Sequence, residues 1–133
     1  AGKGRVVIGA YLMGFAKVIA VEKDRQIFTT LKKNTKKISK GKIIIINDDA
    51  NKFNVKKYLN NRYNTLIFYA YHPFNFNKIL NILEKNFRIK KIKKYFIYFG
   101  FEKNIIKNKK LKYTLLFENK YSDKTRVLRV YKK

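Results

Sequence analysis

Two glycines and one acid near the start of the chain have the types and spacing of a nucleotide site. Gly2 and Gly4 flank a lysine, an apolar run follows, and Glu22 closes a β-branched stretch. Glycine lets backbone N–H groups approach a ligand closely, and the first turn of a helix adds positive potential. An acid about 20 residues after the turn can accept hydrogen bonds from both ribose hydroxyls. The layout therefore predicts a bound nucleotide.

Further polar residues follow two later apolar runs, where strands are expected to end. Asp48 and Asp49 come after four consecutive isoleucines, and His72-Pro73-Phe74 follows the next long apolar run. Ligands of open α/β sheets bind at the carboxyl ends of the strands. Glu22, the two aspartates and His72 are therefore expected along one edge of a sheet. This shared position is stronger evidence for a site than any one residue.

Each candidate also has a plain structural explanation. The glycines can form a tight turn only, Glu22 can pair with Lys23 at the surface, and the aspartates can cap a turn or a helix. His72 is the only histidine, and lone histidines are commonly structural or solvated. In a site, a neutral imidazole could accept a hydrogen bond or act as a base. No third ligand accompanies the aspartates, so no metal site is predicted.

Apolar periodicity indicates the elements that position these residues. Helices are predicted over residues 4–13, 25–38 and 76–87, a loop or short helix over 51–61, and a short helix over 102–107. Strands are predicted at 17–21, 42–46, 64–71, 95–99, 113–117 and 126–131, and continuous apolar runs predict burial on both faces of the second and third. This order predicts an α/β fold with a mostly parallel sheet, helices on both faces and a C-terminal antiparallel hairpin.

The glycine turn should follow a strand, but no residue precedes Ala1 to form it. We expect an upstream segment to hold the first strand, which is missing here, and the start of the glycine motif. Without that strand, which would lie between them, we expect one of three outcomes for the strands ending at Glu22 and Tyr71: another segment fills the gap, the two strands pair directly, or the fold is incomplete. We expect one domain over residues 1–133, incomplete at its N-terminus.

The net charge is +25, because 33 lysines and arginines outnumber 8 acids. This charge can indicate a polyanion partner such as RNA, DNA or an anionic membrane surface. The interpretation we favour is compositional, since the abundant residues share A/T-rich codons and the charges are spread along the chain. No apolar run reaches the ~20 residues of a membrane span. Cysteine is absent, which excludes a disulfide framework and favours a reducing, cytoplasmic location.

Four short segments carry a resemblance that covers nearly the whole chain. They are Gly2-Lys3-Gly4-Arg5, Val21-Glu22, Asp49-Ala50 with Phe53, and His72-Pro73-Phe74. In this order they resemble the motifs of class I S-adenosylmethionine-dependent methyltransferases. The chain is most similar to bacterial methyltransferase-domain proteins with a Gly-Lys-Gly-Arg turn and an Asn-Pro-Phe motif after strand four. The resemblance implies a Rossmann-like fold, S-adenosylmethionine as cofactor and a methyl acceptor that the motifs do not identify.

The resemblance also implies roles for single residues. Glu22 would bind the ribose hydroxyls, and Asp49, or alternatively Asp48, would accept from the adenine amino group. Gly2 and Gly4 would bring the backbone close to the methionine end and the ribose. His72 would occupy the catalytic position, with Pro73 and Phe74 beside the substrate. The sequence departs from the pattern at His72, where the group has Asn, and at Asn47-Asp48, which replaces a more usual Gly.

Two other classes of nucleotide-binding protein fit these residues less well. In a dinucleotide-binding dehydrogenase the third glycine of the fingerprint would fall at Val7, which disfavours that class. A phosphate-binding P-loop would need Ser or Thr after Gly2-Lys3, where Gly4 stands. The alternative that stays open is a catalytically inactive Rossmann-like module that binds RNA or another polyanion through its lysines.

Overall fold

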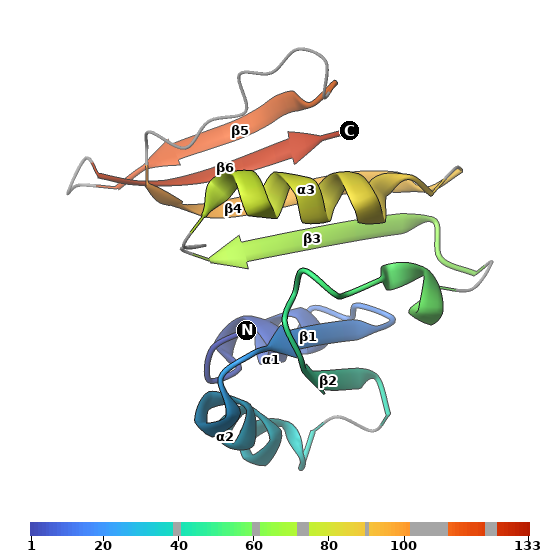
Figure 1. Ribbon diagram of the computed structural model, residues 1–133, viewed down its shortest axis with the longest axis vertical. Helices are drawn as coiled ribbons and strands as arrows, with labels where there is room; N and C mark the ends of the chain where they lie inside the picture. Colours follow the sequence, from blue (N-terminus) through green and yellow to red (C-terminus); the bar gives the residue numbers. More distant parts are fainter. Residues whose placement is uncertain (39–40, 60–61, 72–74, 90, 102–111, 122–124) are drawn as a thin grey trace. The chain divides into compact units, whose positions relative to one another are not determined.

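The structure, a computed structural model, describes residues 1–38, 41–59, 62–71, 75–89, 91–101, 112–121 and 125–133 (Figure 1). The chain divides into two compact units, residues 1–53 and 54–133. Each unit has a hydrophobic core of its own. The single domain expected over residues 1–133 stays a prediction.

The first unit places two helices on one face of a two-stranded parallel sheet. Its elements are α1 (Arg5–Leu12), β1 (Val18–Glu22), α2 (Arg25–Thr35) and β2 (Ile43–Asn47). The strands pair in parallel, with Glu22 opposite Asn47 at their carboxyl ends. Val7 of α1 and Leu31 of α2 pack against Ala20 and Ile43. Alternate residues of a strand point to the same side of the sheet, and the register of β1 and β2 places Ala20 and Ile43 on one face. Both helices therefore cover that face.

The second unit is a four-stranded mixed sheet with a helix along one face (Figure 1). Its elements are η1 (Val55–Tyr58), β3 (Thr65–Tyr71), α3 (Phe76–Phe87), β4 (Lys93–Phe101), β5 (Thr114–Lys120) and β6 (Arg126–Lys132). The strand order is β3-β4-β6-β5. β3 and β4 are parallel, whereas β6 runs antiparallel to both β4 and β5. The predicted C-terminal antiparallel hairpin is therefore confirmed.

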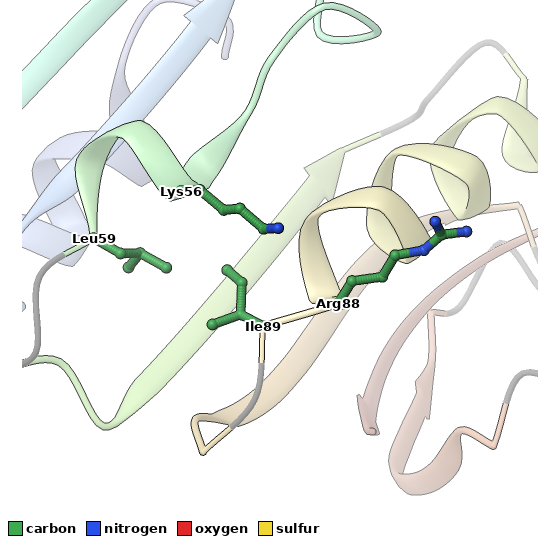
Figure 2. A pocket seen from close by; sticks show the side chains of 4 residues that line it. All are labelled: Lys56, Leu59, Arg88 and Ile89. Atoms are coloured by element: carbon green, nitrogen blue, oxygen red, sulfur yellow. The ribbon is translucent and has the colours of Figure 1, made fainter.

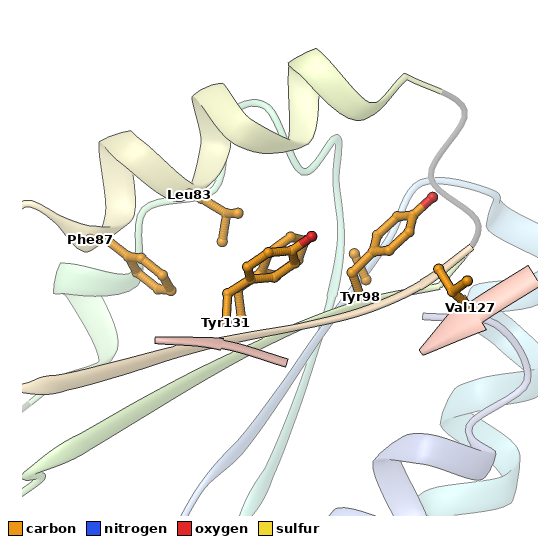
Figure 3. Packing of buried hydrophobic residues seen from close by; sticks show 7 residues of the cluster. Leu83, Phe87, Tyr98, Val127 and Tyr131 are labelled. Carbon is orange, nitrogen blue, oxygen red and sulfur yellow. The ribbon is translucent and has the colours of Figure 1, made fainter. Parts of the chain in front are cut away.

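Helix α3 is held to its sheet by an apolar stripe at helical spacing. Leu83 and Phe87 point from α3 toward Tyr98 and Tyr131 on the sheet, and all four are buried (Figure 3). At the other end of the helix, the Asn75 side chain accepts a hydrogen bond from Lys78 N at 3.0 Å. Such a cap satisfies a donor that the first helical turn leaves unpaired. The predicted helix over residues 76–87 is confirmed at both ends.

Several expectations about the sheet need correction. Among the described strands two pairings are parallel and two antiparallel, so the sheets are mixed rather than mostly parallel. The cause is β6, which returns from the hairpin and inserts between β4 and β5. β3 is not buried on both faces, since Tyr69 and Tyr71 are exposed. The short helix expected over residues 102–107 lies outside the described residues.

Candidate functional site

Glu22, the last residue of β1, collects hydrogen bonds from two segments of the chain. Its Oε2 accepts from Gly2 N at 3.0 Å and from the Ala1 amino group at 2.7 Å, and its Oε1 accepts from Asp24 N at 3.0 Å. Burial alone would raise the pKa of the Glu22 carboxyl. The hydrogen bonds together lower this pKa by more than burial raises it, so it lies below its ordinary value. The structure thus brings Gly2 and Glu22 together around an ionised carboxylate.

The glycine turn opens α1 with a backbone that favours glycine. Gly4 is the N-cap of α1 with a φ of 104°, and its carbonyl accepts from Ile8 N at 2.8 Å. A φ in this range is strained for residues that carry a Cβ. The neighbouring Lys3 carbonyl accepts from Asn34 Nδ2 of α2 at 2.8 Å. The turn that carries Gly2 is therefore anchored to the second helix as well as to Glu22.

Asn47 is a site residue that the sequence reasoning missed. It ends β2 directly opposite Glu22. Its Nδ2 donates to the carbonyl of Glu22 at 2.9 Å and to that of Lys23 at 3.2 Å. Asn47 therefore fixes the backbone just where the Glu22 side chain begins. No local pattern in the sequence marks this contact, because it depends on the register between β1 and β2.

Asp49 is held by hydrogen bonds on both carboxylate oxygens. Oδ2 pairs with Lys23 Nζ at 3.3 Å, and Oδ1 accepts from Asn51 N at 2.9 Å and Asn51 Nδ2 at 2.7 Å. The Asn51 N–H and the Lys23 ammonium lower the pKa of the Asp49 carboxyl. Lys23 thus pairs with Asp49 rather than with Glu22. Asp48 is engaged differently, since its Oδ1 accepts from Asp49 N at 2.7 Å.

The carboxyl ends of β1 and β2 therefore carry two oriented carboxylates in the first unit. Parallel strands lie about 4.8 Å apart, so Glu22 and the segment after β2 share one edge of the sheet. Ionised carboxylates only accept hydrogen bonds, which suits hydroxyl and amino donors of a nucleoside. The described residues include no group of three or more side chains that could hold a metal ion. Nor does the described part of the chain contain a helix long and apolar enough to cross a membrane.

The remaining predicted site residues, His72, Pro73 and Phe74, lie outside the described residues. Directly before them, Tyr71 ends β3 with 61% of its surface exposed. The second unit also has an open pocket of about 340 Å³ lined by Lys56, Leu59, Arg88 and Ile89. Figure 2 shows that the Arg88 side chain extends along α3.

Comparison with known proteins adds a family and a set of similar folds. A family model described as "Conserved hypothetical protein 95" matches residues 1–131. A search of curated proteins finds no match. The fold resembles that of the "putative methyltransferase yhhF" of Escherichia coli, with 18% identity, a TM-score of 0.72, and coverage of 100% of this chain and 71% of that one.

Two further solved structures are similar. A "putative methyltransferase" from Streptococcus mutans, in complex with SAH, is 14% identical with a TM-score of 0.70, over 99% of this chain and 84% of that one. A "putative RNA methyltransferase" from Pyrococcus horikoshii is 18% identical with a TM-score of 0.64, over 100% of this chain and 71% of that one. At these identities the likeness concerns the fold, and it confirms the α/β class predicted from the sequence.

Proposed function

We propose that this chain, which belongs to the family described as conserved hypothetical protein 95, is an S-adenosylmethionine-dependent methyltransferase. The observation that carries the proposal is the pairing of the glycine turn with Glu22, whose Oε2 lies 3.0 Å from Gly2 N. An acid that meets a glycine turn at a strand end suits a nucleoside. The Streptococcus mutans protein, which has a similar fold and was solved with SAH, supports the same cofactor class.

The described residues offer the acceptors that the cofactor needs. The Glu22 carboxylate, which already accepts a hydrogen bond from Gly2 N, would bind the ribose hydroxyls. Asp49 would accept a hydrogen bond from the adenine amino group, because Lys23 holds one oxygen of its carboxylate and Asn51 holds the other. Asp48 is the weaker candidate, because its side chain already accepts a hydrogen bond from Asp49 N. Gly2 and Gly4 would let the methionine end and the ribose approach the backbone.

The cofactor supplies a methyl group already activated on a sulfonium, for in-line displacement by the acceptor nucleophile. The chain's own task is then chiefly to orient donor and acceptor. We assign the acceptor side to the segment after β3. There His72 would orient or deprotonate the nucleophile through a neutral imidazole, and Pro73 and Phe74 would contact the substrate.

RNA is the acceptor class that we propose. The Pyrococcus horikoshii protein of similar fold is described as a "putative RNA methyltransferase". The net charge of +25 fits a polyanion, because lysines that contact phosphates give affinity without requiring a particular sequence. A further role of the second unit in RNA binding would follow from its lysines, of which β4 and α3 carry two each.

Transfer of a labelled methyl group from S-adenosylmethionine to RNA tests this function. We expect label in the RNA only when the chain is present, and at least a tenfold loss with Glu22→Ala, because that variant lacks the carboxylate proposed for the ribose. Glu22→Gln, which keeps the side chain's shape, should be intermediate. Salt-sensitive RNA binding without affinity for SAH would instead identify an inactive RNA-binding module.

A further inference from the structure

The open pocket of the second unit combines an aliphatic floor with two cations. Lys56 and Leu59 line it from η1 and its C-cap, and Arg88 and Ile89 line it from the end of α3. Figure 2 shows the Leu59 and Ile89 side chains pointing toward one another. Lys56 and Arg88 are both exposed. The proposed function gives none of these four residues a role.

The two walls of this pocket are joined beneath its surface. Val55, which precedes Lys56, donates its backbone N–H to Asn86 Oδ1 at 2.7 Å. Asn86 is buried and lies two residues before Arg88. A buried, satisfied hydrogen bond of this kind fixes the backbone on both of its sides. The pocket is therefore preformed, and a preformed site loses less conformational entropy when a ligand binds.

The segments around the pocket carry positive charge without acids. Residues 54–64 and 85–94 contain no Asp or Glu. Glu84, which directly precedes the second segment, pairs with Lys133. Besides the two cations that line the pocket, these segments expose Lys57, Lys91 and Lys93. An anion at the pocket would therefore meet several cations and no carboxylate from either segment, which favours its binding.

The pocket lies at the edge of the sheet where β3 and β4 begin. Lys93 N, at the start of β4, donates to Asn64 O just before β3 at 2.9 Å. Helix α3 runs from the end of β3 to the start of β4, so Arg88 and Ile89 lie at this edge. The proposed acceptor side follows Tyr71, at the opposite end of β3. The 7 residues of β3 separate the two edges by about 20 Å, at about 3.3 Å per residue.

We propose that this pocket is a second contact for the RNA acceptor, in which Lys56 and Arg88 bind a backbone phosphate and that nucleotide's sugar or base lies on Leu59 and Ile89. The inference rests on the proposed function and deepens it, because it sets a minimum size for the RNA. Successive phosphates of one strand lie about 3.4 Å apart along a helix, so a span of about 20 Å needs at least about six nucleotides. The acceptor is therefore a longer RNA rather than a free nucleotide.

The experiment titrates the full chain with a fluorescently labelled RNA hairpin of about 12 base pairs, which is longer than this span. The pocket variant combines Lys56→Met with Arg88→Met. The matched control combines Lys32→Met with Lys33→Met, which removes two exposed cations from the last turn of another helix, α2. Anisotropy at a series of salt concentrations gives the affinity and its salt dependence. Circular dichroism and calorimetry with SAH check the fold and the first unit.

We expect the pocket variant to bind the hairpin about tenfold more weakly than the control, because phosphate contacts dominate such affinities. The slope of log affinity against log salt should become shallower by about 1.5–2, since each of two phosphate contacts contributes about 0.7–0.9. The affinity for SAH should not change. In methyl transfer to total RNA, the pocket variant should raise KM and keep kcat, because the contact is remote from the reacting atoms.

Equal hairpin affinity in the pocket and control variants would overturn the inference and leave the proposed function intact. If the pocket variant lost affinity for poly-glutamate but kept its affinity for the hairpin, the pocket would bind an acidic protein, which would also overturn it. Absence of methyl transfer from the unmodified chain to any RNA would overturn the proposed function, and with it the pocket's role as an acceptor contact.

Discussion

At the scale of single residues, the two glycines of the first turn meet different demands. A Cβ on Gly4 would lie 2.8 Å from Leu31 Cδ1, and its φ is 104°. A Cβ on Gly2 would meet nothing within 4 Å, although its φ of 61° also favours glycine. Gly4 is therefore required for packing α1 on α2. Gly2 has open space beside Glu22, which suits a residue whose backbone meets a ligand.

Replacing Gly4 by Ala should destabilise the first unit by about 1–3 kcal/mol, because the new methyl group overlaps Leu31 in a strained backbone. The matched control is Gly9→Ala within α1, where a Cβ meets nothing within 4 Å. That change should stabilise the helix by about 0.5–1 kcal/mol, since alanine is the better helix former. Urea unfolding measures both. Equal stability of the Gly4→Ala and Gly9→Ala variants would contradict the packing described here.

At the scale of elements, a buried amide joins η1 to α3. Asn86 is 1% exposed; its Oδ1 accepts from Val55 N at 2.7 Å, and its Nδ2 donates to Ile82 O at 2.8 Å. Buried polar groups are stable only when they are hydrogen-bonded. Asn86 therefore fixes the segment before β3 against the helix that follows it.

The change Asn86→Ala should lower the free energy of unfolding by about 1–3 kcal/mol, because it leaves the Val55 N–H buried without its acceptor. Asn81→Ala, on an exposed position of the same helix, should change it by less than about 0.5 kcal/mol. Thermal or urea unfolding of the two variants provides the comparison. If both behaved alike, Asn86 would not be the connection between these elements.

Elements were predictable from sequence where a local signal marks their ends. Residues Phe76–Phe87 have helical periodicity, and both ends of α3 were predicted from it. β4 was expected over residues 95–99 but extends over Lys93–Phe101. The extension comes from pairing with β3 and β6 on its two sides. The strand begins with two lysines, so its first residues do not stand out in a hydropathy pattern. Pairing between strands that are far apart in the sequence cannot be recognised from the residues of one strand alone.

At the scale of the whole molecule, the sequence predicted the family and the proximity of Gly2 to Glu22. The contact between Gly2 and Glu22 follows from the motif, because a strand end returns to the turn that opens its helix. The contacts of Asn47 and Lys23 could not be read from the motif, since they depend on the register between β1 and β2. That the two units form one domain, with helices on both faces of a shared sheet, stays our proposal.

The central claim is that the first unit holds the methyl donor through Glu22, and calorimetric titration of SAH tests it most directly. The unmodified chain should bind SAH, and Glu22→Ala should weaken binding about ten- to hundredfold, because hydrogen bonds to a charged group contribute about 1.5–3 kcal/mol each. Glu22→Gln, checked by circular dichroism for an intact fold, should lose less. Equal affinity of the unmodified chain and Glu22→Ala, or no binding by either, would contradict the account.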